Sequence, residues 1–349
     1  MVIDSIRNFL NNRYSVQEYP ALQYQFERWN QQKPLLGKKI LDGTPVFANT
    51  MLKYINLIAA GAELSVGYSD SIPYDPAVID FLQSIGVDCC RNCTDVERFD
   101  VILDCNGVYR DLRPRYGFTE LTRSGSYRFA GRSDAVVNVD DSRIKAIETC
   151  LGTGEGFLRA MNHLNYPVVD RKIAVLGCGK VGRGVVFYAG RAGADVTAVD
   201  DPALVKEPVG GKLISRFERG KVLQLLQDAD IIVTATGQAL ALADDDFINI
   251  VMNSSKLVVN MGVEDEFGPS VPAGRVLNNK QPLNFILDEP TLLRYIDPTM
   301  ALHSHGALEL IQSEYTPGLR RPDPAIHDEY WQIVEKNGII AEELSAAGL

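Results

Sequence analysis

The stretch KIAVLGCGKVGRGVVFYAGRAGADVTAVDDP, residues 172–202, constrains the fold more than any other part of the chain. An apolar run at 172–176 leads into Gly177, Gly179 and Gly182. A helical pattern follows, and a second short apolar run then ends in acidic residues. This order of strand, glycine turn, helix and strand is typical of a dinucleotide-binding βαβ unit.

The three glycines have separate expected roles. Gly177 allows a tight turn, Gly179 lets the backbone approach a pyrophosphate, and Gly182 lets the helix pack closely on the strand. Lys180 and Val181 lie in the same turn, where the helix N-terminus offers free N–H groups and a positive dipole end. We therefore predict that all five residues of this turn bind the cofactor.

The acidic end of the second strand indicates which dinucleotide is bound. Asp200 lies 18 residues after Gly182 (200 − 182), where a carboxylate accepts hydrogen bonds from the ribose hydroxyls and repels a 2′-phosphate. No Arg lies between residues 198 and 205. The pattern predicts NAD rather than NADP, with Asp201 and Pro202 opening a turn.

Composition excludes several classes of partner. The 349 residues are 46% hydrophobic, enough for two domains with cores, and carry a net charge of −10. No basic run exceeds Arg320-Arg321, so nucleic acid is not an expected partner. No apolar stretch approaches the roughly 20 residues of a membrane span, and the N-terminus lacks a signal-peptide core, so we expect a cytoplasmic protein.

The cysteines predict neither metal nor disulfides. The six cysteines are scattered, which suits a reducing compartment. Cys89, Cys90 and Cys93 cluster, but no nearby His completes a zinc set. We expect ordinary thiols at the end of a strand, and no metal.

Strands and helices alternate along the whole chain, which predicts an α/β fold of two Rossmann-like, doubly wound parallel-sheet domains joined by bridging helices. A substrate domain would comprise residues 1–142 and 303–349, and an NAD-binding domain residues 143–302. The bridge would be the amphipathic stretch 143–164, which glycines bend or divide. The other expected strands are 38–41, 63–67, 101–103, 230–235 and 257–261, and the other expected helices are 50–60, 76–85, 300–312 and one in the tail from 317.

Two loops of the cofactor domain should line its ligand. They follow the apolar runs 230–235 and 257–261, which read as buried parallel strands. Ligands of open parallel sheets lie outside the carboxyl ends of the strands. The predicted cofactor contacts in these loops are Thr234, Ala235, Thr236, Gly237, Asn260 and Gly262.

Several ordered motifs resemble those of adenosylhomocysteinases, over residues 33 to 305. Residues 138–145, NVDDSRIK, are similar to the family's N-V-N-D-S-x-x-K signature. The remaining matches keep the family's order: Pro34-Leu35-Leu36-Gly37, Gly61-Ala62-Glu63, Ile102-Leu103-Asp104, the T-x-T-G loop at 234–237 and the N-x-G loop at 260–262.

The resemblance implies two domains that close over an internal NAD. In this family NAD oxidises the 3′-hydroxyl of the substrate ribose, a thiol or water is exchanged by elimination and addition, and NADH reduces the ketone again. A lysine near that hydroxyl transfers a proton, and Lys145 occupies its place here. The alternative is that Lys145 is a solvated helix lysine.

The departures from the family concentrate on the substrate side. Residues that differ from the family's acids, bases and polar contacts are Pro45, Cys105, Leu121, Thr149, Cys150, Val263 and Asp297. The family's C-terminal tail with Lys and Tyr is also absent from this sequence. Because losing one acid or base costs about 10²- to 10⁴-fold, we expect no useful hydrolysis of adenosylhomocysteine.

The leading hypothesis is an NAD-dependent oxidoreductase that moves a hydride between NAD and a different polar metabolite. Its predicted catalytic residues are Lys145, Asp104, Glu120 and His303; Arg123 and His305 would bind substrate, and Thr122 and Ser124 the cofactor. Arg123 could otherwise form a salt bridge, and at most one of the two histidines should face the site. The alternatives are an NAD-binding sensor without turnover and a divergent hydrolase; a homodimer is expected.

Overall fold

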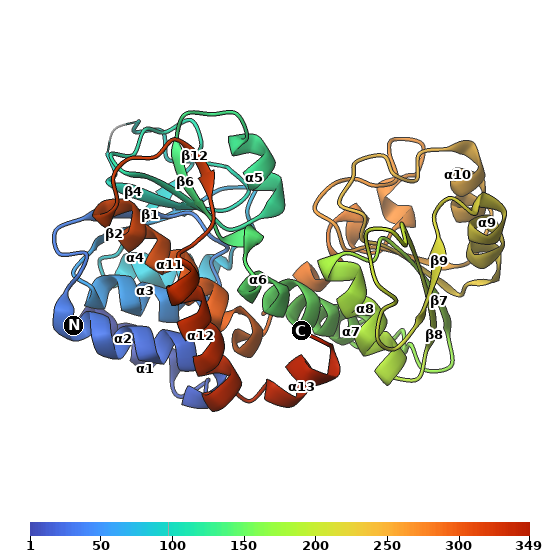
Figure 1. The fold of residues 1–349 in the computed structure, drawn as a ribbon, viewed down its shortest axis with the longest axis horizontal. Coiled ribbons are helices and arrows are strands. Elements are labelled where there is room, and N and C mark those ends of the chain that lie inside the picture. The colour runs from blue at the N-terminus through green and yellow to red at the C-terminus, as the bar shows by residue number, and fades with distance from the viewer. Residues whose placement is uncertain (97) are drawn as a thin grey trace. The chain divides into compact units, whose positions relative to one another are not determined.

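The computed structural model describes residues 1–96 and 98–349, which divide into two compact units (Figure 1). Unit 1 comprises Met1–Lys145 and Leu293–Ala341, and unit 2 comprises Ala146–Leu292 and Glu342–Leu349. Each unit contains one parallel sheet with helices. The predicted α/β class with two parallel, Rossmann-like sheets is confirmed.

Unit 1 is built on a seven-stranded parallel sheet in the order β12-β6-β5-β4-β1-β2-β3. The strands are β1 (Lys39–Asp42), β2 (Glu63–Tyr68), β3 (Asp88–Arg91), β4 (Val101–Asp104), β5 (Gly117–Glu120), β6 (Ala135–Asn138) and β12 (Gly318–Arg320). The helices are α1 (Val2–Leu10), α2 (Pro20–Gln32), α3 (Thr50–Ala59), α4 (Pro76–Ser84), α5 (Arg123–Phe129), α11 (Leu293–Gln312) and α12 (Pro324–Asn337), with the 3₁₀ turns Val16–Glu18 and Val139–Asp141.

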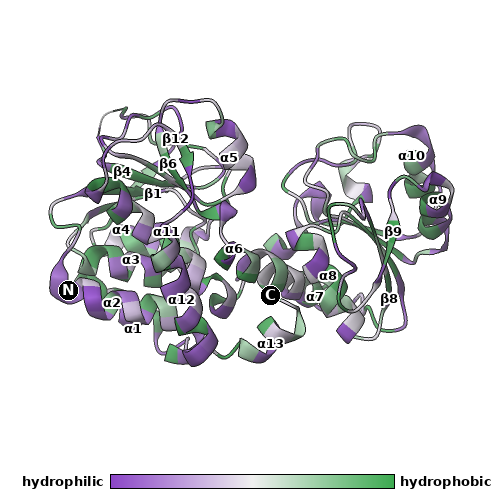
Figure 2. Cartoon of the chain, viewed as in Figure 1, coloured by the Kyte–Doolittle hydropathy of each residue, from purple (hydrophilic) through white to green (hydrophobic). Residues whose placement is uncertain are grey.

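Alternate strand residues of unit 1 enter two separate cores. Ile40 and Val101 pack with Trp29 and Leu57, on the face covered by α2, α3 and α11. The neighbouring residues Leu41, Ile102 and Phe118 instead pack with Phe129 of α5. The strands are therefore buried on both faces, which explains their nearly continuous apolar sequences. On helices such as α2 and α12, hydrophilic and hydrophobic residues lie side by side (Figure 2).

Unit 2 is built on a five-stranded parallel sheet in the order β11-β10-β7-β8-β9. The strands are β7 (Lys172–Leu176), β8 (Asp195–Asp200), β9 (Lys212–Ser215), β10 (Ile231–Thr234) and β11 (Leu257–Asn260). The helices are α7 (Thr153–His163), α8 (Lys180–Arg191), α9 (Arg219–Asp228), α10 (Asp245–Met252) and, near the C-terminus, α13 (Ala341–Ala346), with 3₁₀ turns at Ala273–Arg275, Asn278–Lys280 and Leu283–Ile286. One core lies under α7 and α8, and the other under α9 and α10.

The glycine-rich stretch before strand β7 forms one continuous helical run that contains a wider, π-helical segment. A short helix α6 (Ile144–Ala146) continues into a π-helical segment (Ile147–Gly152) and then into α7. A side chain at Gly154 would clash with the backbone of Gly184, and one at Gly184 would clash with the Cys150 carbonyl. The glycines that we expected to bend this stretch also let α7 and α8 pack at close backbone distance.

The structure corrects one helix boundary and adds strands. Helix α11 begins at Leu293, not near residue 300, and it accommodates Pro298 in its interior. The tail helix is α12, in which Trp331 is buried and Ile333 is half-buried. The strands β5, β6, β9 and β12 were not predicted, and β5 is buried along its whole length.

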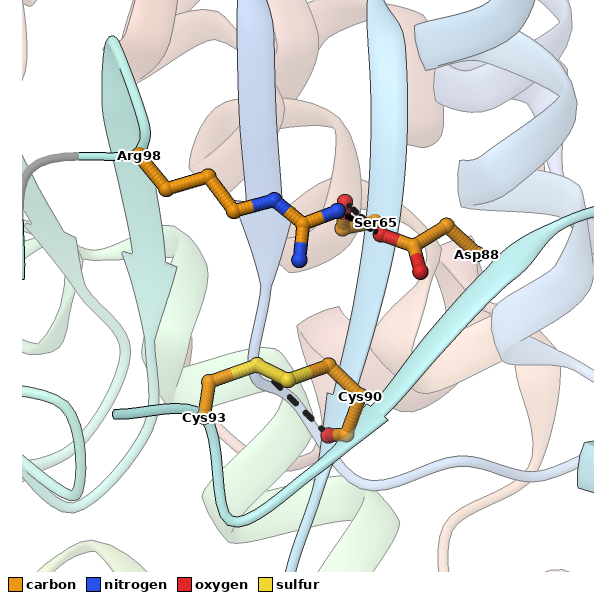
Figure 3. The surroundings of a disulfide bond; sticks show 5 residues. All are labelled: Ser65, Asp88, Cys90, Cys93 and Arg98. Carbon is orange, nitrogen blue, oxygen red and sulfur yellow. Dashed lines mark hydrogen bonds and ion pairs between the residues drawn. A yellow bond between two sulfur atoms is a disulfide. The ribbon is translucent and has the colours of Figure 1, made fainter. Parts of the chain in front are cut away.

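The cysteine cluster also differs from the prediction. Cys90, in the edge strand β3, and Cys93 form a disulfide (Figure 3). Cys89 is a free thiol, and burial raises its pKa to about 11. Nearby, Asp88 accepts a hydrogen bond from Ser65 at 2.5 Å and pairs with Arg98. Among the described residues no group of three potential ligands could hold a metal ion.

A buried carboxylate fastens α2 to α11. Pro20 begins α2, and the following N–H groups of Ala21 and Leu22 donate to the Asp297 carboxylate at 2.9 and 2.8 Å. These N–H groups have no partner within the helix, so Asp297 supplies the cap that the neighbouring Tyr19 does not. Asp297 is fully buried, and this burial raises its pKa to about 7 although the two N–H groups oppose the shift.

We predict that this pKa makes folding stability fall as the pH rises. The native state holds the Asp297 proton up to about pH 7, whereas the unfolded chain releases it near the ordinary value of 3.8. The stabilising effect is therefore complete below pH 3.8 and is lost as the pH rises to 7. Asp297→Asn, which cannot ionise, should flatten this part of the dependence in urea unfolding.

The matched control is Asp323→Asn, which alters an exposed carboxylate that caps α12 through the Ala325 N–H. It should keep the pH profile of the unaltered protein. Parallel profiles for Asp297→Asn and the unaltered protein between pH 4 and 7 would contradict the assignment.

Candidate functional site

The glycine turn between β7 and α8 has a different constraint at each glycine. Gly177 has a φ of +93°, and a side chain there would clash with the Ala235 carbonyl. A side chain at Gly182 would clash with the Gly177 carbonyl, while one at Gly179 would meet nothing within 4 Å. Turn geometry and packing thus require Gly177 and Gly182, and the open space lies at Gly179, where the fingerprint places a pyrophosphate.

The N-terminus of α8 can receive an anion. Gly179 is its N-cap and has no side chain, so no side chain caps the helix. The first N–H groups of a helix have no partner inside it and carry partial positive charge. Lys180 and Val181, in the first turn, are both half-buried. The five residues that we predicted for the pyrophosphate therefore form one uncapped turn with room beside it.

Asp200 lies at the end of β8, beside the same turn. Its carboxylate accepts hydrogen bonds from the N–H groups of Cys178 at 2.5 Å and Asp201 at 2.7 Å. It therefore ties the second strand to the glycine turn. Asp200 is half-buried rather than enclosed, and a carboxylate oxygen accepts more than one hydrogen bond, so it remains able to meet ribose hydroxyls.

An arginine that the sequence analysis missed lies beside these two acids. The N–H of Arg216 donates to the Asp200 carbonyl at 2.9 Å, and its guanidinium lies 3.4 Å from the Asp201 carboxylate. Arg216 follows β9, which pairs with β8. Position 216 lies beyond the residues 198–205 that surround Asp200 in the sequence, and only the pairing of β9 with β8 brings it to this edge. Asp201, expected only to open a turn, also holds Arg216.

The two other cofactor loops are tied together by Asn260 and Glu266. The Asn260 side chain accepts from Thr234 Oγ1 at 3.1 Å and from the Gly262 N–H at 2.9 Å, and donates to the carbonyls of Glu264 and Lys280. Thr234 and Asn260 are buried, so their side chains hold the two loops in place from the protein interior. The more accessible predicted contacts are Ala235, Thr236, Gly237 and Gly262.

Glu266 is a second residue that the sequence analysis missed. Its carboxylate accepts from Thr236 Oγ1 at 2.7 Å, the Gly237 N–H at 2.8 Å and the Thr236 N–H at 3.1 Å. It is fully buried, and burial raises its pKa despite these donors. A glutamate in a loop gives no periodic signal, so only the folded loops show its role.

In unit 1, Lys53 and His303 form a buried polar cluster with Asp42 at the carboxyl end of β1. The Lys53 ammonium lies 2.5 Å from the Asp42 carboxylate and 2.9 Å from Nδ1 of His303. Nε2 of His303 lies 2.7 Å from the Thr119 carbonyl. All three side chains are at most 1% exposed.

This geometry fixes the state of His303. An ammonium only donates, so Nδ1 of His303 accepts, and Nε2–H donates to the Thr119 carbonyl. Burial and the Lys53 charge hold the pKa of His303 well below its ordinary value. Both ring nitrogens are thus engaged within the protein, which does not fit the predicted role of His303 as an acid or base. We assign it a positioning role.

Lys53 could have been noticed in the sequence. It lies between Leu52 and Tyr54 in a mostly apolar helix, and a lysine inside such a helix must find a buried partner. Burial lowers the pKa of Lys53, and Asp42 opposes that shift. The partner carboxylate and histidine come from β1 and α11, which sequence spacing does not bring together.

Asp104 and Glu120 end the adjacent strands β4 and β5 in register. Asp104 accepts from the N–H groups of Cys105, Val108 and Tyr109. Burial and the neighbouring Glu120 charge raise the pKa of Asp104, and burial raises the pKa of Glu120.

Glu120 holds the loop after β4 from the other side. It accepts from the N–H groups of Asn106, Gly107 and Thr122 and from Thr122 Oγ1. A side chain at Gly125 would clash with its carboxylate. Asp104 and Glu120, both fully buried, therefore position this loop and the start of α5.

The remaining predicted residues lie in different surroundings. Lys145 is 3% exposed. Its charge helps to lower the pKa of His303, so the two side chains are close enough to interact electrostatically. Thr122 caps α5 and receives the Gly125 N–H, while Ser124 donates to Thr122. Arg123 is exposed and donates to the Tyr127 hydroxyl at 2.8 Å.

His305, which was predicted to bind substrate, packs against helices and does not lie at the strand ends. Its ring packs near Trp29 of α2 and Tyr330 of α12, with Nδ1 3.4 Å from the Tyr330 hydroxyl. Burial lowers its pKa to about 4. His303 and His305 point to different neighbours, as alternate residues of a helix must, and His305 packs against helices rather than strand ends.

The described residues thus form a two-unit α/β protein with polar loops at the carboxyl ends of its parallel strands. No family profile matches the chain. It is 25% identical over 263 residues to an adenosylhomocysteinase of Thermoplasma acidophilum, covering 66% of this chain and 63% of that protein. It is 26% identical to an S-inosyl-L-homocysteine hydrolase of Methanosarcina mazei, covering 70% of this chain and 66% of that protein.

These similarities agree with the resemblance to adenosylhomocysteinases that the motifs indicated. The chain spans slightly less than two thirds of the length of the curated relatives that it matches. Among solved structures, a dipicolinate synthase from Bacillus halodurans shares the fold, with a TM-score of 0.52 and 16% identity over 80% of this chain and 100% of that one. In the described parts of the chain, no helix is long and apolar enough to cross a membrane.

We predict that the Asp42–Lys53 pair is strongly coupled. Lys53→Met should lower the free energy of unfolding by about 3 kcal/mol or more, because it leaves a buried carboxylate without its cation. The double variant Asp42→Asn/Lys53→Met should recover part of that loss. Urea unfolding of the two single variants and the double variant measures the coupling.

The control is the exposed Arg91–Asp70 pair, where Arg91→Met should change stability little. Additive effects of the Asp42 and Lys53 changes would show that the buried cluster does not act as a unit.

Proposed function

We propose that this chain is an NAD-dependent oxidoreductase that transfers a hydride between NAD and a polar small metabolite. The observation that carries the proposal is the open, uncapped turn at Gly179, with Asp200 at the end of the neighbouring strand. The adenosylhomocysteinase-like sequence supports NAD as the cofactor. NAD, when bound, supplies the hydride acceptor, and the side chains of the protein bind, orient and move protons.

The residues of unit 2 would divide this work. The N–H groups at the start of α8 would hold the pyrophosphate, and Asp200 would accept hydrogen bonds from the ribose hydroxyls. Glu266 and Asn260 would keep the loops after β10 and β11 in place, so that Ala235, Thr236, Gly237 and Gly262 contact the cofactor. Unit 2 would thus be the NAD-binding domain and unit 1 the substrate domain.

Lys145 would transfer the proton of the redox step. It is the lysine of the best-matched family motif, and it is buried. Its charge lies near His303, which the Lys53 ammonium keeps neutral. A neutral His303 avoids placing a third positive charge beside Lys145 and Lys53. Asp104, Glu120 and His303 would position the surrounding loops, and Arg123, with its exposed guanidinium, would bind a substrate carboxylate.

The substrate would differ from adenosylhomocysteine. Pro45, Leu121, Thr149 and Val263 stand where the family has acids, bases or amide contacts, and none of these four side chains has a group that ionises near neutral pH. We propose a small polar metabolite with a hydroxyl or amine on the oxidised carbon. We also propose that the chain acts as a homodimer, so that light scattering should give twice the 38.5 kDa chain mass.

We predict that the protein binds NAD at least tenfold more tightly than NADP, because Asp200 repels a 2′-phosphate. Calorimetric titration of both cofactors measures the preference. Asp200→Ala should erode it, since the nearby Arg216 would then be able to pair with the 2′-phosphate. Adding Arg216→Met to that variant should weaken NADP and leave NAD nearly unchanged. Equal or tighter NADP binding by the unaltered protein would refute the assignment of Asp200.

We predict that Lys145→Met removes turnover without removing the cofactor. The variant keeps the side-chain length, so NAD affinity should stay nearly intact while hydride transfer falls by about 10²-fold or more. The measurement is NADH absorbance with a panel of hydroxy and amino metabolites. Lys180→Met is the control, because a change in the pyrophosphate turn should weaken NAD binding. Unchanged turnover in Lys145→Met would show that another residue moves the proton.

The same panel separates the proposal from its alternatives. NAD binding with no NADH formed by any metabolite would favour a sensor. Thiol release from adenosylhomocysteine at rates typical of an enzyme would favour a divergent hydrolase.

A further inference from the structure

Two cysteines of unit 1 are joined in a C-x-x-C arrangement at the edge of its sheet. Cys90 is the third residue of the edge strand β3, and Cys93 lies in the loop that follows it (Figure 3). Neither cysteine is among the residues that we assign to NAD binding, proton transfer or loop positioning. The pair therefore needs an explanation of its own.

This disulfide is a weak structural crosslink. A disulfide stabilises a fold chiefly by restricting the unfolded chain, and the effect grows with the length of the loop that it closes. Only Arg91 and Asn92 separate the two linked cysteines. The bond joins the end of one strand to the turn directly after it, so it connects no distant parts of unit 1.

Hydrogen bonds hold the same segment independently of the sulfurs. Strand β3 pairs with β2 from Asp88 to Arg91, and the Ser65 hydroxyl donates to the Asp88 carboxylate at 2.5 Å across this pair. Asn92 adopts the left-handed conformation that turns the chain, with φ of 50°, and its N–H donates to the Tyr68 carbonyl at 2.9 Å. The turn can therefore keep its shape when the two sulfurs separate.

The two sulfurs differ in how a solvent molecule reaches them. Cys90 is half-buried, whereas Cys93 is 8% exposed and packs in a core with Phe99 and Ile102. Disulfides that a thiolate can reach are the ones that exchange. An incoming thiolate would meet the sulfur of Cys90 first, which makes Cys93 the leaving group.

The reduced form of Cys93 has a hydrogen-bond partner. Its sulfur lies 3.6 Å from the Cys90 carbonyl, within reach of an S–H donor (Figure 3). In the disulfide this sulfur carries no hydrogen, so the contact gains its proton only on reduction. The buried thiol is therefore not left without an acceptor when the bond opens.

The third cysteine of the cluster does not compete for this bond. Successive side chains of a strand point to opposite faces of the sheet, so Cys89 and Cys90 lie on different faces. Burial and the charge of Asp88 raise the pKa of Cys89 to about 11, so it stays a thiol near neutral pH. Because the thiolate is the nucleophile in exchange, Cys89 attacks neither sulfur of the pair readily.

We infer that Cys90 and Cys93 form a reversible thiol–disulfide exchange site whose substrates are thiols. A substrate thiolate attacks the Cys90 sulfur, the bond between the two cysteines breaks, and its electron pair leaves on the Cys93 sulfur, which takes up a proton. A second substrate thiolate then attacks the substrate sulfur of this mixed disulfide and releases Cys90, which also takes up a proton. Two substrate thiols are oxidised to one disulfide, and the protein disulfide is reduced to two thiols. The site is independent of the proposed NAD-dependent function.

A titration of the full chain between an excess of glutathione disulfide and an excess of dithiothreitol tests the inference. At each ratio the native protein is equilibrated, quenched with acid and alkylated in denaturant, and the peptides that contain the three cysteines are analysed by mass spectrometry. Cys90 and Cys93 should gain and lose the label together in both directions, while Cys89 should be labelled throughout. A pair that stays linked in excess dithiothreitol, or that never links in excess glutathione disulfide, would overturn the inference.

Single variants then locate the chemistry. Cys93→Ser should trap a glutathione mixed disulfide on Cys90, whereas Cys90→Ser should form one on the buried Cys93 at least tenfold more slowly. Cys89→Ser is the matched control and should leave the titration unchanged. Equal rates in the first two variants, or a shifted titration in Cys89→Ser, would contradict the assignment of these sulfurs.

Unfolding separates an exchange site from a structural crosslink. The oxidised and reduced forms of the unaltered protein should give the same circular dichroism and unfold at nearly the same urea concentration, because the bond closes so short a loop. A reduced chain that is unfolded in the absence of urea would show that the bond is structural, and the inference would then be wrong.

Discussion

Hydrogen bonds from backbone N–H groups to side-chain carboxylates are the interaction on which the loops of both units depend. Asp104 and Glu120 hold the loop after β4, Asp200 holds the glycine turn, and Glu266 holds the loop after β10. Strand ends in parallel sheets leave polar backbone groups that must find partners away from water. Charge-assisted hydrogen bonds satisfy these groups more strongly than neutral ones, so each loop is fixed where a ligand would meet it.

This interaction separates two kinds of residue that look alike in a sequence. An acid or histidine after a strand suggests catalysis, yet Asp104, Glu120 and His303 have their polar atoms engaged within the protein. By contrast, Gly179 has open space beside it, and the start of α8 has no side-chain cap. The room for a ligand therefore lies at backbone atoms, and the acids keep that backbone in place.

The sequence predicted the parts of the fold that depend on local patterns. The glycine spacing and the apolar runs of β7, β8, β10 and β11 each carry their own signal, and the structure places strands there. The strand β5 went unpredicted because its four residues, GFTE, show no alternation and are buried on both faces. Helix α11 was predicted too short: it begins at Leu293, seven residues before Met300, and accommodates Pro298 in its interior.

The missed site residues all depend on contacts between distant segments. Lys53 meets His303 across 250 positions, Arg216 reaches Asp201 through the pairing of β8 with β9, and Glu266 reaches the loop after β10. The cysteines show the same limit: Cys90 and Cys93 are linked in the structure although composition favoured free thiols. Spacing in a sequence identifies motifs, whereas the identity of a buried partner follows from the folded sheet.

The central claim is that the strand-end loops of unit 2 form an NAD site. A crystal structure of the protein grown with NAD tests it most directly. We expect the pyrophosphate at the N-terminus of α8, next to Gly179, with the ribose hydroxyls hydrogen-bonded to Asp200. NAD bound away from this turn, or a ribose whose hydroxyls do not meet Asp200, would contradict the account.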